Sequence, residues 1–314
     1  MPIINSILPI LVLLISGFMI EKFWLKDKSF WSAINKLVYY IFFPSLIVYD
    51  VANASIAYSS SGFIVVLIVL VFILLFFLRA FKFFFKDEKF WVVFVQGSFR
   101  YNSYVFIGVT VSYFNPAEAM PIIAIITASM IALANIVGLI MLNEKDPKNK
   151  KNLFAVIIEL LRNPLIIACI LGFVFNVLAK YVPIILNIDP LNLVLSNFSS
   201  ASIVLSIMAV GASIKFNINM LKIVGIINCS IVKLIIFPVA VVLVLSPLGF
   251  DKTLVAICMI YAASPASTSA YAMVYLLKGD HESMGNIISM QTVMCIVTIP
   301  ILLLIFPYLF NLWN

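Results

Sequence analysis

Charged residues are scarce in this sequence. They make up 11% of its 314 residues, whereas charged residues are about 25% of an ordinary soluble domain. Hydrophobic residues make up 64%. A chain with so little charge cannot cover a soluble surface, so the composition excludes an ordinary soluble domain. The sequence is predicted to be that of an all-α integral membrane protein.

The sequence also lacks motifs for hydrolysis, metal binding and nucleotide binding. The chain has one histidine, no His-Glu-x-x-His motif, no paired intramembrane aspartates and no nucleotide-binding motif. Its four cysteines show no paired or metal-type spacing: Cys169, Cys229, Cys258 and Cys295. We therefore expect no metal and no cofactor, and these absences argue against ATP-driven transport and against an intramembrane hydrolase. For a hydrolase, only a Ser230 to Lys233 dyad is conceivable on spacing.

Apolar runs separated by short polar loops predict ten transmembrane helices. In residues 1–142 the expected spans are about 3–23, 35–51, 63–85, 90–114 and 120–142. Residues 143–153 form a polar linker, and residues 154–314 hold spans at about 154–179, 196–214, 223–245, 253–277 and 287–309. Because five is odd, the second set enters the membrane from the opposite side. The sequence thus predicts two inverted five-helix repeats.

Polar residues interrupt the fourth and ninth spans. The first interruption is Ser98-Phe99-Arg100-Tyr101-Asn102-Ser103, and the second is Ser264-Pro265-Ala266-Ser267-Thr268-Ser269. At about 1.5 Å per residue from Lys89, Arg100 lies roughly 15 Å into its span, near the bilayer midplane. Broken helices in corresponding positions of two repeats are typical of a transporter binding site.

These interruptions supply the predicted substrate site: Arg100, Asn102, Ser103, Ser264, Pro265, Ser267 and Thr268. A midplane guanidinium is costly unless it faces a cavity, so Arg100 favours an anion site. Asn102 can bind either backbone or a carboxylate. The second break frees backbone N–H groups, which also attract anions.

Four further polar residues within spans are candidates for charge balance or ion coupling: Asp50, Arg162, Asn163 and Lys233. Asp50 is interpreted as an interfacial residue or as a proton or cation site. Arg162 either pairs with Glu159 on one helix face or acts with Asn163. Lys233 lies near mid-depth, which favours a cavity-facing or charge-paired role. The coupling ion would be H⁺ or Na⁺.

Loop charges predict the orientation. Of the 20 lysines and arginines, fourteen lie in odd-numbered loops, and only Lys180 and Lys252 lie in even-numbered ones. By the positive-inside rule the odd loops and the 143–153 linker are cytoplasmic, so both termini lie outside the cell membrane. This distribution also explains the net charge of +7 without nucleic-acid binding.

Motifs along nearly the whole chain resemble the auxin efflux carrier family, which includes plant auxin exporters and bacterial malate or malonate permeases. They are Asn35-Lys36-Leu37-Val38 with Pro44, Ser98 to Asn102 with Gly108, Arg162-Asn163-Pro164, Met208-Ala209-Val210-Gly211, Lys233 with Pro238, and Pro265 with Gly279-Asp280 and Pro300. The resemblance implies spans four and nine crossing at their breaks. It also implies a homodimer, in which a transport domain of spans three to five and eight to ten moves against a scaffold of spans one, two, six and seven.

By the same resemblance, Asn102 matches the crossover asparagine that contacts substrate carboxylate in the plant members, and Pro265 matches the crossover proline of the second half. Tyr101 replaces a proline of the plant members, which predicts a shallower first break. The long cytoplasmic loop of many plant exporters is absent. The expected function is secondary transport of a small mono- or dicarboxylate, rather than of auxin, by alternating access. The alternatives are a sodium-coupled carrier of the bile-acid-symporter type and a channel.

Overall fold

The computed structural model describes residues 2–54, 62–85, 87–145, 153–181, 189–214 and 222–311. Within these ranges every regular element is a helix and no strand occurs. The all-α prediction is therefore confirmed for the described part of the chain.

The helices of the first half run in this order. They are α1 (Pro2–Phe23), α2 (Lys28–Leu37), the π-helix η1 (Val38–Phe42), α3 (Phe43–Ala52), α4 (Phe63–Ala80), the 3₁₀-helix η3 (Phe81–Phe84), α5 (Glu88–Phe99), α6 (Ser103–Tyr113) and α7 (Pro116–Lys145).

The second half begins with α8 (Leu153–Leu161), α9 (Pro164–Tyr181) and α10 (Asp189–Ala212). It continues with α11 (Ile223–Ile231), the π-helix η6 (Val232–Ile236), α12 (Phe237–Leu245), the 3₁₀-helix η7 (Ser246–Leu248), α13 (Lys252–Ala263), α14 (Thr268–Leu276) and α15 (His281–Phe310).

Six helices of the described residues are long and apolar enough to cross a membrane. They are Ser29–Ala52, Phe63–Phe83, Pro116–Glu144, Asn192–Ala212, Ile223–Leu248 and His281–Phe310. The pair α13 and α14, bent by 41°, makes a seventh if it is one span. A multi-pass helical membrane protein follows, while the ten spans and the inverted repeat stay predictions.

The second helix begins earlier than the sequence predicts. We expected it near Asn35, but α2 begins at Lys28 and continues through η1 into α3. Asp27 explains this start, because its carboxylate accepts hydrogen bonds from the backbone N–H and the hydroxyl of Ser29. A hydropathy pattern detects the apolar part of a helix and misses a polar first turn capped in this way.

The sixth span is not continuous, which corrects the expected single helix over 154–179. The helix α8 ends at Leu161, and α9 begins at Pro164. Asn163 Oδ1 accepts a hydrogen bond from the Leu165 N–H at 3.0 Å and so caps α9. Pro164 then occupies the first helical position, where its missing N–H costs nothing.

Contacts between residues divide the chain into two compact units, and each unit is built from three stretches of sequence. Unit 1 contains Met1–Ser59, Ile107–Ala132 and Asn152–Ser213, and unit 2 contains Ser60–Phe106, Leu133–Lys151 and Ile214–Asn314. The predicted boundaries at 1–142, 143–153 and 154–314 stay a prediction. Most of the predicted linker, residues 146–152, lies outside the described residues.

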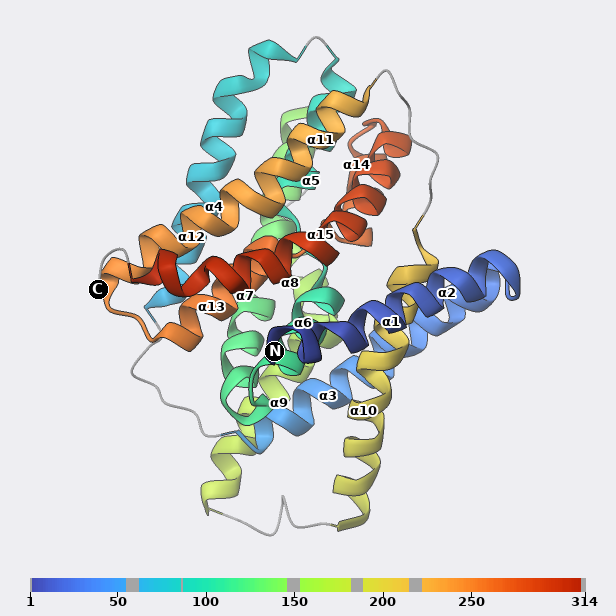
Figure 1. Cartoon of the computed structure of the whole chain (residues 1–314), viewed down its shortest axis with the longest axis vertical. Helices are drawn as coiled ribbons and strands as arrows, with labels where there is room; N and C mark the ends of the chain where they lie inside the picture. The colour runs from blue at the N-terminus through green and yellow to red at the C-terminus, as the bar shows by residue number, and fades with distance from the viewer. Residues whose placement is uncertain are drawn as a thin grey trace. The chain divides into compact units, whose positions relative to one another are not determined.

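Unit 1 depends on close helix packing. The helix α3 packs against α9 and α10, and α10 also packs along α1 (Figure 1). A Cβ on Gly17 would lie 2.0 Å from the Met208 carbonyl oxygen, and one on Gly211 would lie 2.0 Å from that of Leu14. Glycine at these two positions therefore lets the α1 and α10 backbones touch, as small residues do in membrane helix pairs.

Unit 2 surrounds the two breaks predicted from the sequence. The helix α15 packs against α5, α11, α12, α13 and α14, and α12 packs against α13 (Figure 1). Almost every residue of α13 from Leu254 to Ala263 is buried. This continuous burial holds the second break in place from one side.

At the beginning of α15, three charged residues of unit 2 meet. Lys222 Nζ lies 2.5 Å from Asp280 Oδ2 and 3.5 Å from Asp87 Oδ2. The hydrogen bond to Asp280 raises the pKa of the Lys222 ammonium. Burial acts to raise the pKa of the Asp280 carboxyl, but hydrogen bonds from Lys222 and Ser283 hold it below its usual value.

We predict that Gly17→Ala destabilises the protein. The added methyl group would overlap the backbone of Met208, so the helices must separate, at a cost of about 1–3 kcal/mol. Thermal unfolding in detergent measures this effect. Gly62→Ala is the control, since a Cβ there meets nothing within 4 Å. Equal unfolding temperatures for the Gly17 and Gly62 variants would contradict the packing described for α1 and α10.

We also predict a pH-dependent contribution from Asp280. Its lowered pKa stabilises the fold above the unfolded value of 3.8 and the effect is lost as pH falls through the folded pKa. The raised pKa of Lys222 stabilises below 10.5, and that effect is lost as pH rises further. Asp280→Asn should therefore cost up to about 1 kcal/mol at pH 7, a small value because solvent screens the pair.

The difference between wild type and Asp280→Asn should shrink toward pH 3 in the same unfolding assay. Asp280→Ala is the matched variant, because it also loses the cap on the Ser283 N–H. Loss of this cap should lower the free energy of unfolding by a further ~0.5–2 kcal/mol at every pH. A wild-type to Asn difference that stays constant from pH 7 to pH 3 would rule out the ion pair as its cause.

Candidate functional site

The first predicted break is present in unit 2. The helix α5 ends at Phe99, Arg100 is extended at φ −69° and ψ 148°, and α6 begins at Ser103. The Arg100 N–H still donates to the Gln96 carbonyl. Three residues, Arg100, Tyr101 and Asn102, thus separate the half-helices.

The second predicted break is also present in unit 2. The helix α13 ends at Ala263, Ser264 is extended at φ −71° and ψ 138°, and α14 begins at Thr268. Pro265 lacks an N–H and disfavours helical backbone at Ser264, which explains why α13 stops there. The Ser264 hydroxyl donates to the Ile260 carbonyl at 2.8 Å and satisfies one acceptor of the last turn.

The two breaks touch each other. The Asn102 N–H donates to the Pro265 carbonyl at 2.7 Å. Gln291 of α15 joins them a second time: its Oε1 accepts from the Ala266 N–H at 2.8 Å, and its Nε2 donates to the Gly97 carbonyl at 3.1 Å. Backbone groups freed in the interior must find partners, and here each break supplies partners for the other.

Arg100 is 4% exposed and lies at this junction. Its Nε donates to Gln96 Oε1, one amino group donates to the Ala134 carbonyl at 2.9 Å, and the other donates to Ser269 Oγ at 3.4 Å. Among the described residues, no carboxylate lies within ion-pair distance of the guanidinium. The cation is therefore solvated by neutral acceptors.

Asn102 has a structural role that the sequence left open. Its Oδ1 accepts hydrogen bonds from the N–H groups of Tyr104 at 3.0 Å and Val105 at 3.4 Å, which caps α6. The side chain is 5% exposed. Because the acceptor end serves the helix, the amide donor Nδ2 is the end suited to an anion.

The other residues predicted for the substrate site lie around the same junction. Ser103 begins α6 and is half-buried, while Ser267 and Thr268 begin α14. Ser267 occupies the N-cap position without a side-chain cap bond. Its hydroxyl instead pairs with Ser269 Oγ at 2.6 Å, the same atom that accepts from Arg100. The structure therefore gathers all seven predicted site residues in unit 2.

The four predicted charge or coupling residues divide between the units. Lys233 belongs to unit 2, whereas Asp50, Arg162 and Asn163 belong to unit 1. Asp50 is half-buried in α3, and Arg162 is exposed between α8 and α9. The Glu159 side chain, and with it the predicted pair with Arg162, lies outside the described residues. Asn163 serves as the cap of α9.

Two glutamines at the junction were not predicted as site residues. Gln96 orients Arg100, and Gln291 bridges the breaks. Both are completely buried. The available signal was an amide within an apolar helix. Arg100 lies only four residues after Gln96, whereas the partners of Gln291 lie 25 and 194 residues away in the sequence.

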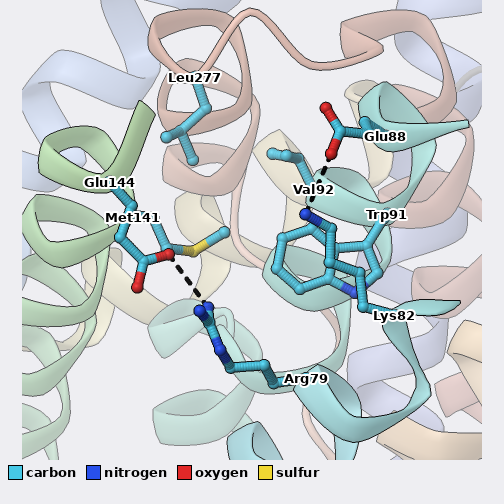
Figure 2. A pocket seen from close by; sticks show the side chains of 8 residues that line it. All are labelled: Arg79, Lys82, Glu88, Trp91, Val92, Met141, Glu144 and Leu277. Carbon is cyan, nitrogen blue, oxygen red and sulfur yellow. Dashed lines mark hydrogen bonds and ion pairs between the residues drawn. The ribbon is translucent and has the colours of Figure 1, made fainter. Parts of the chain in front are cut away.

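A separate cavity of about 430 Å³ lies in unit 2 (Figure 2). Its charges are matched in pairs: Arg79 with Glu144 and Lys82 with Glu88, both at 3.0 Å. Arg100 is not among its lining residues. Because the four charged side chains are substantially exposed, these pairs contribute little to stability, and we assign the cavity no role in the anion site.

We predict that Gln291→Met destabilises unit 2 although it preserves side-chain volume. The change leaves the Ala266 N–H and the Gly97 carbonyl without their partner, which costs about 1–3 kcal/mol for each buried group. Thr292→Val is the control, since it removes only a bond within α15. If Gln291→Met unfolds at the control temperature in detergent, the bridge does not hold the breaks.

Comparison with known families supports a transport role. A family model described as membrane transport protein matches residues 2–303. A search of curated proteins found no significant match. The family match covers both breaks and nearly the whole chain, and it confirms the resemblance to auxin efflux carriers. The chain belongs to the membrane transport protein family.

Proposed function

We propose that this protein is a secondary carrier of a small mono- or dicarboxylate that works by alternating access. The observation that carries this proposal is the buried Arg100 guanidinium at the junction of two broken helices, surrounded by neutral acceptors. A buried cation without a carboxylate partner is costly and suits an anionic ligand.

The geometry of Arg100 leaves donors for a carboxylate. A guanidinium has five N–H groups, and three of them are used by Gln96, Ala134 and Ser269. Within the described residues, two N–H groups are therefore available to an anion. The pair formed by one carboxylate and two guanidinium N–H groups is among the stronger hydrogen-bonded arrangements.

Asn102 and the second break would complete the anion site. The Asn102 amide donates to the carboxylate while its oxygen caps α6. The helix α14 begins at Thr268 after Ser267, which makes no side-chain cap bond, and such a half-helix N-terminus favours negative charge. Ser103 and Ser264 line the same junction through the adjoining half-helices.

The wider architecture of the proposal follows the loop charges and the family resemblance. Ten spans form two inverted repeats, both termini lie outside, and the 143–153 linker is cytoplasmic. Spans three to five and eight to ten move against spans one, two, six and seven in an elevator-type cycle within a homodimer of the cell membrane. Such a motion exposes the anion site to each side in turn.

Uptake into proteoliposomes tests the proposed function. Labelled acetate, pyruvate, malonate and malate are offered with proton and sodium gradients imposed separately. Uptake of at least one carboxylate that saturates and shows counterflow supports a carrier, and acceleration by sodium alone would favour the sodium-coupled alternative. Single-channel currents would reveal a channel, and no uptake of any carboxylate would reject an organic-anion carrier.

We predict that Arg100→Lys and Asn102→Ala weaken carboxylate binding in well-folded protein. Lysine keeps the charge but loses the planar paired donors. Loss of one buried hydrogen-bond partner costs roughly 1–3 kcal/mol, or about 5- to 150-fold in affinity. The two losses should be non-additive because both side chains contact one ligand. Scintillation proximity with the transported carboxylate measures each affinity.

Asn102→Ser is the matched variant for the second residue. Serine retains an oxygen able to cap α6 but has no amide donor, so it separates helix capping from anion binding. We expect Asn102→Ser to unfold at nearly the wild-type temperature and still bind carboxylate weakly. Wild-type affinity in folded Arg100→Lys and Asn102→Ser proteins would place the anion site elsewhere.

A further inference from the structure

Lys233 is the second buried cation of unit 2, and its surroundings differ from those of Arg100. It lies in η6, is 0% exposed, and its Nζ has no hydrogen-bond partner among the described residues. Two aromatic rings lie beside it: Nζ lies 5.5 Å from the ring centre of Phe237 and 5.6 Å from that of Tyr261.

The contrast with Arg100 concerns how each charge is solvated. Arg100 has three acceptors that replace water, and arginine keeps its proton in proteins. Lys233 has two ring faces and the Cys229 thiol beside it, and ring faces replace the hydration of an ammonium less well than hydrogen-bond acceptors do. A buried ammonium without acceptors is costly, and a lysine can lower that cost by releasing its proton.

Lys233 is also connected to both broken helices. One turn before it, Cys229 Sγ lies 3.5 Å from Ser98 Oγ and 3.7 Å from Gln291 Nε2. On the other side, Tyr261 of α13 packs edge to face against Tyr101, with ring centres 4.7 Å apart. Tyr101 lies between Arg100 and Asn102. A change of charge at Lys233 therefore acts next to the anion site.

The titratable groups around Lys233 include no carboxylate partner. Cys229 and Tyr261 face it, Tyr101 lies behind Tyr261, and α12 has no titratable residue. Other titratable or charged groups occur on the elements that pack against η6. They are Cys258 and Lys252 of α13, Cys295, His281, Glu282 and Tyr308 of α15, and Glu88, Lys89 and the adjoining Arg100 of α5. Five of these groups lie in the first turns of their helices: Glu88, Lys89, Lys252, His281 and Glu282. No ion pair joins Lys233 to any described residue.

We propose that Lys233 couples anion transport to protons. The amine is neutral while the junction is empty, and it takes one proton from water when a carboxylate binds beside Arg100. The only bond made is N–H, and the same proton returns to water when the anion leaves on the other side. One proton and one monocarboxylate thus cross together without net charge. This inference rests on the proposed function, because it requires an anion at the junction.

Two variants test the proposal without depending on the substrate. If Lys233 is neutral in the empty folded protein, unfolding takes up one proton there, so wild type gains stability as pH rises. Relative to Lys233→Met, the wild-type unfolding constant should fall tenfold per pH unit within the range pH 7 to pH 9. Lys252→Met, at an exposed lysine, is the control and should parallel wild type. Parallel profiles for wild type and Lys233→Met overturn the proposal.

Transport supplies the second measurement, with labelled acetate, pyruvate, malonate and malate in proteoliposomes. Wild-type uptake should accelerate under an inward proton gradient, and Lys233→Met should keep counterflow but lose that acceleration. Proton-driven uptake that survives in folded Lys233→Met also overturns the proposal. If wild type transports none of these carboxylates, the proposed function fails, while the stability profiles still decide whether Lys233 sheds its proton.

Discussion

The hydrogen bond between the Asn102 N–H and the Pro265 carbonyl is the contact on which unit 2 depends. A helix that breaks inside an apolar interior leaves backbone groups that nothing nearby satisfies. Here two breaks lie against each other and share their unpaired groups, and Gln291 adds one donor and one acceptor. Neither break would be stable alone, so the two interruptions in the sequence form one structural feature.

This arrangement also explains how an arginine is held at the junction. Where α5 stops, the Arg100 side chain meets carbonyl and hydroxyl oxygens from segments near Ala134 and Ser269. A Cβ on Gly138 would lie 2.5 Å from the Met273 methyl group and 3.2 Å from the guanidinium, so glycine there leaves room for both side chains. The cation is thereby positioned and solvated within the protein, which under the proposed function reduces the reorganisation that binding an anion requires.

The sequence predicted the part of the fold that polar residues mark within apolar runs. Arg100, Asn102 and Pro265 disrupt such runs, and both breaks occur where these residues lie. The break at Asn163 was missed although Pro164 follows it, because the hydropathy of the run gave no reason to divide it. Gln291 was missed because its partners, Gly97 and Ala266, are brought to it only by tertiary packing. The two contact-defined units, each assembled from three separate stretches, were not predictable for the same reason.

Prolines within the apolar spans of this chain have two different effects on the helix: at some the helix continues through a widened turn, and at Pro265 it stops. Before Pro44 and Pro238 the helix widens into the π-helices η1 and η6, in which Phe43 and Phe237 donate to residues five positions earlier. The widened turn relieves the clash of the proline ring, and the helix continues. At Pro265 the freed backbone instead finds polar partners: the Asn102 N–H donates to the Pro265 carbonyl, and Gln291 of α15 accepts from the next N–H, that of Ala266. The helix can therefore stop there. Lys233 lies in one of the widened turns, which means that its helix remains intact beside the breaks. The proton uptake proposed for Lys233 therefore takes place on an intact helix and requires no rearrangement of the junction itself.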